Sequence, residues 1–373
     1  MIYLDNAATT FSLPEVISNY VDISKNCPGN PSSLHRLGVA AADCLSKARQ
    51  DIGKVAKLNP NWITFTGSAT EANQIILLGS VGTPNARFNH ILLSPFEHPS
   101  VDKAVPELEK RGFKVEYLNC NQEGVVTLNE IAHKLCSTTA LVSIIGVHNE
   151  IGVMQDIVGI KNLIHKTNPK TLFHVDGVQW FGKFLLPSET HMPDFLTFSG
   201  HKFHGPKGVG GFLKRPSVHL RPLIQGGGQE QGLRSGTENL SGIAGMAKAL
   251  VELHKHDYKE KMQHMQMNIF DYVSNKSTLE WIGPKPGKTR SPYITLFSCL
   301  GHQSEVLIHQ LESKNIYVAS GSACSEKKKE TKDYWKLMGL TPKAQESILR
   351  VSTSHMNSDA DINTFLKALD SIL

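Results

Sequence analysis

Two residues of opposite charge follow apolar runs in the middle of the chain and could hold a cofactor between them. Lys202 lies just after the run 195–198, and Asp176 follows the run 172–175. A lysine amine can form a Schiff base with an aldehyde, and a carboxylate can keep a pyridine nitrogen protonated so that the ring accepts electrons. Each residue alone is more simply a solvated lysine or a helix N-cap. Together at two strand ends, they predict a pyridoxal-phosphate site.

A third segment has the residue types of an anion site. TGSATE (66–71) lies between the β-rich run 62–65 and an apolar segment that begins near Asn73. Backbone N–H groups at a helix N-terminus, together with the Thr70 hydroxyl, suit a phosphate group. An ordinary N-cap with a capping box explains the segment equally well by itself.

Three further polar residues also follow predicted strands. His98 could lie over an aromatic ring and move protons near neutral pH. Gln179, three residues beyond Asp176, could bond the phenolic oxygen of the cofactor, and Asn149 could do the same from a neighbouring strand. An isolated histidine is more often structural, and loop capping also accounts for the two amides.

The elements that must position these residues are strands of one sheet. β-rich runs alternate with amphipathic stretches, which predicts a largely parallel, doubly wound α/β sheet with its site at the carboxyl ends of the strands. The runs are 62–65, 91–94, 115–118, 141–146, 172–175, 195–198 and 210–213. Residues 240–274 are predicted to form one long helix that leads out of this sheet. The loop 284–287 and the strand-like run 293–297 indicate a second, smaller domain.

Composition excludes several classes of protein. The 373 residues carry a net charge of +5, from 39 basic and 34 acidic residues, which is too weak for a nucleic-acid surface. The six cysteines include no C-x-x-C pair and no zinc spacing, so we expect no metal and a reduced protein. The start of the chain lacks the pattern of a signal peptide, and no apolar run approaches the roughly 20 residues of a membrane span. We therefore expect a cytoplasmic protein.

Ten segments carry a resemblance that covers nearly the whole chain. They are YLDNAATT (3–10), GNPSSLHRLG (29–38), TEAN (70–73), EH (97–98), NEIGVMQDI (149–157), HVDGVQ (174–179), SGHKFHGPKGVG (199–210), RSGTEN (234–239), SGSAC (320–324) and the segment around Arg350. In this order they resemble group I, NifS/IscS-type cysteine desulfurases of the class V aminotransferase family. The resemblance implies a fold type I pyridoxal-phosphate transferase. Its seven-stranded, mainly parallel sheet would lie in a large domain of residues 15–255, beside a smaller α+β domain of residues 1–14 and 256–373.

The resemblance also implies residue roles around the cofactor. Lys202 would be the Schiff-base lysine, Asp176 would pair with the ring nitrogen and His98 would stack on the ring. Gln179 and Asn149 would surround the phenolic oxygen. The residues that would bind the cofactor phosphate are Ala69, Thr70, Ser199 and His201.

Two further roles concern the partner subunit and the substrate. In similar enzymes the threonine of the RSGT motif comes from the partner subunit, so Thr237 implies a homodimer with shared active sites. Arg350 fits the arginine that clamps the substrate carboxylate, because a planar fork suits a carboxylate better than lysine does.

The activity implied is conversion of L-cysteine to L-alanine. Lys202 would remove the α-proton, and Cys324 would take the sulfur as a persulfide for a protein acceptor, such as an iron–sulfur scaffold or a tRNA thiolation enzyme. The glycine and serine residues around Cys324 predict an exposed loop. The basic run 327–329 could lower the pKa of its thiol, although a solvated surface run is the simpler interpretation.

Three other functions remain open. Selenocysteine lyase and transamination are reactions of the same scaffold, and transamination needs no thiol nucleophile such as Cys324. A non-catalytic binding partner with this fold has no need for Lys202, Asp176 and Arg350. Alanine and sulfide formed in equal amounts from cysteine would distinguish desulfuration from these functions.

Overall fold

The computed structural model describes residues 1–321 and 334–373. Cys324, its predicted loop and the basic run 327–329 lie outside the described residues.

The large sheet has seven strands in the order β2-β8-β7-β6-β5-β3-β4. Its strands are β2 (Ile63–Thr66), β3 (His90–Leu93), β4 (Lys114–Tyr117), β5 (Thr139–Ile145), β6 (Leu172–Asp176), β7 (Phe195–Ser199) and β8 (Gly210–Lys214). The pairs among β3 to β7 are parallel, and β8 runs antiparallel to both β7 and β2. The predicted seven-stranded, mainly parallel sheet is confirmed, and every predicted strand end agrees to within one or two residues.

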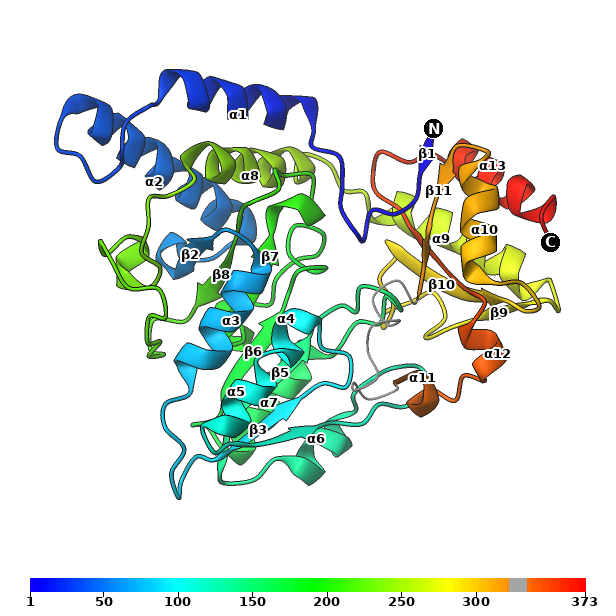
Figure 1. The fold of residues 1–373 in the computed structure, drawn as a ribbon, viewed down its shortest axis with the longest axis horizontal. Helices are drawn as coiled ribbons and strands as arrows, with labels where there is room; N and C mark the ends of the chain where they lie inside the picture. The colour runs from blue at the N-terminus through cyan, green and yellow to red at the C-terminus, as the bar shows by residue number, and fades with distance from the viewer. Residues whose placement is uncertain (322–333) are drawn as a thin grey trace.

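Helices cover both faces of this sheet (Figure 1). They are α1 (Pro14–Asn26), α2 (Arg36–Ala56), α3 (Ala69–Ser80), α4 (Pro99–Asp102), α5 (Val105–Lys110), α6 (Leu128–Lys134), α7 (Ile157–Thr167) and α8 (Leu240–Leu253). Alternate residues of one strand point to opposite faces, so Ile91 and Leu93 pack with α3, α4 and α5, whereas Leu92 joins the core beneath α2, α7 and α8. Burial on both faces explains why these strands read as continuous apolar runs.

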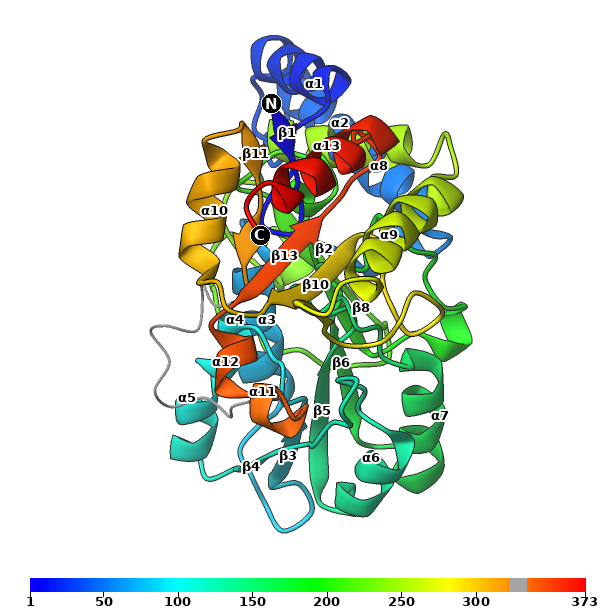
Figure 2. The same ribbon diagram turned by 90° about the vertical axis from the view of Figure 1, so that its right-hand side faces the viewer.

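The second core belongs to a smaller antiparallel sheet, in the order β12-β13-β10-β9. Figure 2 shows β10 and β13 crossing this part of the molecule. The elements are α9 (Lys259–Ser274), β9 (Leu279–Trp281), β10 (Ile294–Cys299), α10 (Ser304–Glu312), β11 (Ile316–Tyr317), β12 (Ala319–Ser320), α11 (Tyr334–Leu337), α12 (Pro342–Gln345), β13 (Ile348–Ser352) and α13 (Asp359–Asp370). The predicted small α+β unit is thus present. The boundaries at 14/15 and 255/256 stay a prediction.

The prediction of one long helix over 240–274 is wrong. The segment forms two helices, α8 and α9, which are separated at residues 254–258. His254 caps the end of α8, and the Asp257 side chain accepts a hydrogen bond from the N–H of Lys259 at the start of α9. The two helices bury their apolar faces in different cores, which a single straight helix could not do.

The first residues of the chain join the two cores (Figure 1). Strand β1 (Ile2–Tyr3) pairs in parallel with β11, and Leu4 lies fully buried in the core of the smaller sheet. Beyond it, Asp5 bridges to Ser352 of β13, and Thr10 N–H donates to the carbonyl of His201 at 2.9 Å. The segment therefore passes from the small sheet to the carboxyl end of β7. Among the described helices, none is long and apolar enough to cross a membrane.

Candidate active site

Lys202 follows directly from the end of β7. It closes a short 3-10 turn, Gly200–Lys202, and its Nζ donates hydrogen bonds of 2.8 Å to the carbonyl oxygens of both Ala7 and Ala8. The amine therefore lies where the N-terminal segment meets the carboxyl edge of the large sheet. This is the position predicted from the sequence, with a backbone partner that the sequence did not reveal.

Asp176 ends the neighbouring strand β6 and is almost fully buried. Its Oδ2 accepts a hydrogen bond from Asn73 Nδ2 at 2.9 Å, and its Oδ1 accepts one from the N–H of Val178 at 3.1 Å. The simpler interpretation as a helix N-cap is wrong, because residues 178–183 form turns and no helix, although one oxygen does cap the following turn. The other oxygen belongs to a side-chain network, which orients the carboxylate.

That network continues to His98. Asn73 Nδ2 also donates to Ser100 Oγ at 2.8 Å, and Ser100 Oγ lies 2.8 Å from His98 Nδ1. The N–H of Ser100 donates to the same Nδ1 at 3.1 Å, so Nδ1 is an acceptor and a neutral His98 carries its proton on Nε2. Asp176 and His98 are therefore positioned by one chain of hydrogen bonds.

The predicted phosphate segment forms the start of α3. Ser68 caps the helix by accepting from the N–H of Glu71 at 3.2 Å, and Glu71 Oε2 accepts from the N–H of Gly67 at 2.8 Å. Ala69 and Thr70 are the first two residues of the helix, where N–H groups have no carbonyl partner within the helix. The cap therefore exists, and it leaves these two N–H groups at the N-terminal end of α3, where an anion could accept hydrogen bonds.

Ser199 and His201 flank the turn that carries Lys202. Ser199 is the buried last residue of β7, and His201 Nδ1 lies 3.1 Å from Thr9 Oγ1. Burial, followed by the charges of Lys202 and Lys207, lowers the pKa of His201 to about 4. His201 is consequently a neutral hydrogen-bonding group at pH 7.

Gln179 is buried just beyond β6. Its Nε2 donates to the carbonyl of Ala7 at 2.8 Å, the same oxygen that accepts from Lys202. Its Oε1 accepts from Lys183 Nζ at 2.7 Å. Sequence reasoning missed Lys183, whose pKa is lowered to about 7 by burial and then by the charges of Lys202 and Arg350.

Arg350 comes from β13 of the small sheet. One guanidinium nitrogen donates to Asp5 Oδ1 at 2.7 Å and another donates to the carbonyl of Asn149 at 3.0 Å. Its Nε is buried and has no hydrogen-bond partner within the part of the chain that the structure describes. The backbone of Asn149 thus meets Arg350 between the two cores.

The charges at this edge are unevenly distributed. Lys202, Lys183 and Arg350 lie close enough for the charges of Lys202 and Arg350 to lower the pKa of Lys183. Burial, followed by repulsion from Asp176, raises the pKa of Glu97 well above its usual value. An excess of cations favours an anionic ligand.

Two predicted residues stand apart from this group. Thr237 is exposed in the loop before α8. Cys324 lies outside the described residues. The structure therefore brings together the residues expected around the ring and the carboxylate, from both cores.

The class V aminotransferase family model matches residues 2–365. A NifS/IcsS protein homologue of Lactobacillus delbrueckii is 38% identical over 376 residues, covering 100% of this chain and 97% of that protein. The cysteine desulfurase IscS of Clostridium botulinum is 32% identical over 376 residues, covering 100% of this chain and 94% of that protein. The solved structure of a NifS-like protein superposes with a TM-score of 0.92 at 33% identity, covering 100% of this chain and 98% of that chain.

Proposed function

The chain belongs to the class V aminotransferase family, and we propose that it is a pyridoxal-phosphate-dependent cysteine desulfurase. It would convert L-cysteine to L-alanine and hold the sulfur as a persulfide on Cys324. The resemblance to NifS/IscS-type enzymes is confirmed, as is the α/β fold of the fold type I transferases. The observation that carries the proposal is the placement of Lys202 and Asp176 at the ends of two adjacent parallel strands.

The residues present fit pyridoxal phosphate. The buried carboxylate of Asp176 is already oriented by Asn73, which suits it to holding a proton on a pyridine nitrogen. Lys202 offers a primary amine whose partners here are backbone carbonyls. When bound, the cofactor supplies a ring that accepts the electron pair left on the substrate α-carbon.

The phosphate would be held by groups at the edge of the sheet. The proposed set is Ala69, Thr70, Ser199 and His201 of one subunit and Thr237 of the other. The helix N-terminus supplies N–H donors, and the neutral His201 supplies one more. Thr237 is exposed in this subunit, which leaves it accessible to a second copy of the chain.

Exposed apolar side chains also support the proposal of a homodimer. Several large apolar side chains of α1, α2 and the link between them are exposed, and a second copy would cover them. They include Ile17 at 55%, Leu34 at 97%, Leu37 at 49% and Val39 at 50% exposure.

Arg350 is proposed to bind the substrate carboxylate. In this structure one carboxylate oxygen of Asp5 lies 2.7 Å from one guanidinium nitrogen. The substrate carboxylate would use N–H donors of the guanidinium that Asp5 and Asn149 leave unused, where a bidentate pair fixes both distance and orientation. Asn149, whose carbonyl already meets Arg350, and Gln179 would lie between this clamp and the phenolic oxygen.

Proton movement would fall to Lys202 and His98. Lys202, displaced by the substrate amine, would take the α-proton as general base. His98 carries its proton on Nε2, so it can donate one when the product carbon is reprotonated. Asp176 would pair with the proton on the ring nitrogen.

The thiol must reach this site from β12. In β12, Ala319 pairs with Arg350 itself, so this strand lies beside the carboxylate clamp. Sulfur would then pass to a protein acceptor, such as an iron–sulfur scaffold or a tRNA thiolation enzyme, in the cytoplasm.

The test is to supply cysteine and a reductant to the cofactor-loaded protein and to quantify alanine and sulfide. Equal amounts are expected from the wild type. Cys324→Ser should keep the cofactor colour and lose sulfide release, whereas the matched variant Cys136→Ser, at an exposed cysteine outside the site, should resemble the wild type. Alanine without sulfide would contradict the proposal, and so would full turnover by Cys324→Ser. Selenocysteine assayed in parallel separates the lyase alternative.

A further inference from the structure

The segment after β6 folds back on itself as successive turns. The N–H groups of Trp180 and Phe181 both donate to the carbonyl of Gly177 at 2.8 Å, and the N–H of Phe184 donates to that of Trp180 at 3.1 Å. Residues four apart lie on the same side of such a helical turn. Gln179 and Lys183 have this spacing, which places their side chains next to each other.

The turn is fixed to the core just before Lys183. Phe181 stacks on Phe198 with a centroid distance of 4.4 Å. Gly182 has φ of +80°, and a Cβ at that position would come within 2.7 Å of the Phe203 ring. The backbone therefore holds Lys183 in one place.

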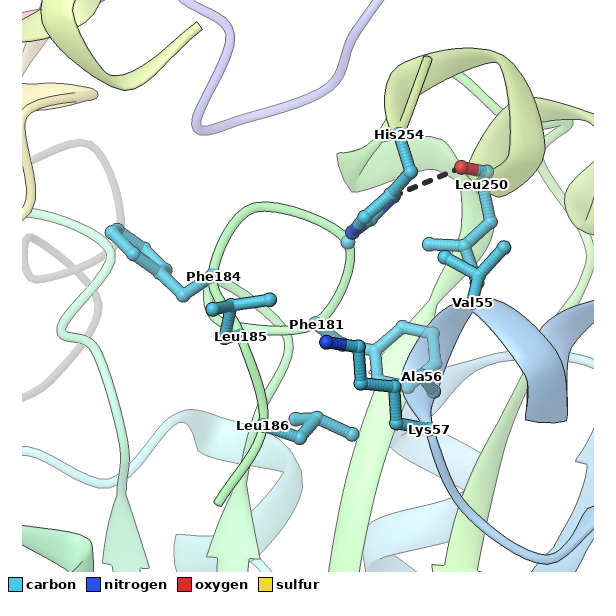
Figure 3. Close-up of a pocket in the computed structure, with 10 residues that line it drawn as sticks. Val55, Ala56, Lys57, Phe181, Phe184, Leu185, Leu186, Leu250 and His254 are labelled. Carbon is cyan, nitrogen blue, oxygen red and sulfur yellow. Dashed lines mark hydrogen bonds between the residues drawn. The ribbon is translucent and has the colours of Figure 1, made fainter. Parts of the chain in front are cut away.

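The apolar residues next to Lys183 in the sequence line a pocket of their own. Phe181, Phe184, Leu185 and Leu186 line a pocket of about 100 Å³ beside the ends of α2 and α8 (Figure 3). Lys183 is not among the residues that line this pocket. Its side chain is committed instead to Gln179, on the side of the cofactor residues.

The contact determines which end of the Gln179 amide faces which neighbour. Lys183 Nζ is a donor, so the oxygen Oε1 must face it, as the 2.7 Å distance shows. The Nε2 end then faces the opposite way, where it donates to Ala7 O at 2.8 Å. Lys202 Nζ donates to the same oxygen, so Nε2 of Gln179 and the amine of Lys202 converge at one point.

The groups around Lys183 are cations or neutral. Lys202 and Arg350 lower its pKa, after burial, and Lys183 in turn lowers the pKa values of His201 and His204.

Its Nζ also lies 5.7 Å from the centre of the Tyr293 ring. Burial raises the pKa of that phenol to about 12, so the ring stays neutral. A bound anionic cofactor would thus add negative charge to a region where positive charge is in excess.

We propose that Lys183 is a positioning residue, which holds the Gln179 amide so that its N–H₂ end points at the phenolic oxygen of the bound cofactor. The inference rests on the proposed function, in which Gln179 meets that oxygen. A donor aimed at the oxygen stabilises its anionic form, so the proton shared between that oxygen and the nitrogen of Lys202 is released at lower pH. Without Lys183 the amide can turn and present its oxygen, which would repel the anion.

The test is a pH titration of the visible absorbance of the cofactor-loaded protein, which reports loss of that shared proton. Lys183→Met should raise the transition pH by about one unit, and Gln179→Leu should raise it similarly. Lys183→Arg keeps a donor and should lie nearer the wild type. The matched control Lys166→Met, at an exposed position of α7, should leave the transition unchanged.

The double variant Gln179→Leu/Lys183→Met decides between two ways in which Lys183 could act. If Lys183 works through Gln179, the double variant should titrate like Gln179→Leu alone. Additive shifts would show that the charge of Lys183 acts directly, which overturns the positioning role, as would a wild-type transition in Lys183→Met. A wild-type protein that bound no cofactor would overturn this inference together with the proposed function, so the two failures are distinct.

Discussion

The two halves of the candidate site are built in different ways. Asp176, Asn73, Ser100 and His98 come from the large sheet and its helices, and hydrogen bonds of 2.8 to 2.9 Å join them. The clamp at Arg350 is assembled from the small sheet, the segment at Asp5 and the carbonyl of Asn149. The residues that would bind the ring and move protons thus lie within the core of the large sheet. The residues that would bind the substrate carboxylate come together only where the two cores meet.

The largest effect should come from the large-sheet half. Asp176→Asn keeps the size of the side chain and removes the charge that holds a ring proton. We expect alanine formation to fall roughly 10²- to 10⁴-fold, with the cofactor still attached through Lys202. Steady-state kinetics and the visible spectrum measure the two effects. Asp156→Asn, at the cap of α7, is the control, and more than a tenth of wild-type activity in Asp176→Asn would contradict the assignment.

The same half should make the protein sensitive to acid. His174 is fully buried on β6, and burial lowers its pKa to about 4, against an opposing effect of Asp176. The unfolded chain binds the proton with an ordinary pKa of about 6.5, so stability is fully present above pH 6.5 and is lost as the pH falls toward 4. His174 alone would account for about 3 kcal/mol of that loss.

The measurement compares unfolding in urea at several pH values between 7 and 4.5. His174→Gln should lose less stability over this interval than the wild type, whereas His133→Gln, at an exposed position of α6, should follow the wild type. If the free energy of unfolding fell equally with pH in His174→Gln and in the wild type, the ring would be charged in the folded protein.

A substitution of Arg350 should weaken substrate binding. Arg350→Lys keeps the charge and loses the planar fork, so we expect KM for cysteine to rise roughly 10- to 100-fold, with a smaller change in kcat. Initial rates over a range of cysteine concentrations test this. An unchanged KM would remove Arg350 from the carboxylate site and leave it a purely structural link between the cores.

The smallest effect is expected at Asp5. Its side chain is 23% exposed and contacts Arg350, whose side chain is 9% exposed, so Asp5 would act on the substrate only through Arg350. Asp5→Asn should raise KM by a few-fold, because Arg350 loses a group that orients it. A lower KM in this variant would mean instead that Asp5 competes with the substrate for the same guanidinium.

The sequence predicted the large-sheet half well because its signals are local. Most strands are buried apolar runs, Asp176 is the last residue of β6, and Lys202 lies three residues after the end of β7. Polar residues at the carboxyl ends of parallel strands meet at one edge, so their proximity follows from the fold class alone.

Contacts between distant segments could not be predicted in this way. Lys202 donates to the backbone carbonyls of Ala7 and Ala8. Every residue has a backbone carbonyl, so the residue types at these positions give no indication of the contact. Lys183 could not be singled out from the sequence, because its contact with Gln179 depends on a turn held in place by Phe181. The break between α8 and α9 was missed because it depends on which core each helix covers, which local periodicity does not encode.

The pairing of Ile2 with Ile316 and of Asp5 with Ser352 also constrains how the protein is made. A nascent chain leaves the ribosome from its N-terminus, so β1 emerges long before the strands that receive it. The large sheet can form meanwhile, but residues 2–5 cannot reach their final position until β11 and β13 have been synthesised. The Lys202 amine should therefore settle against Ala7 only after β13 has emerged.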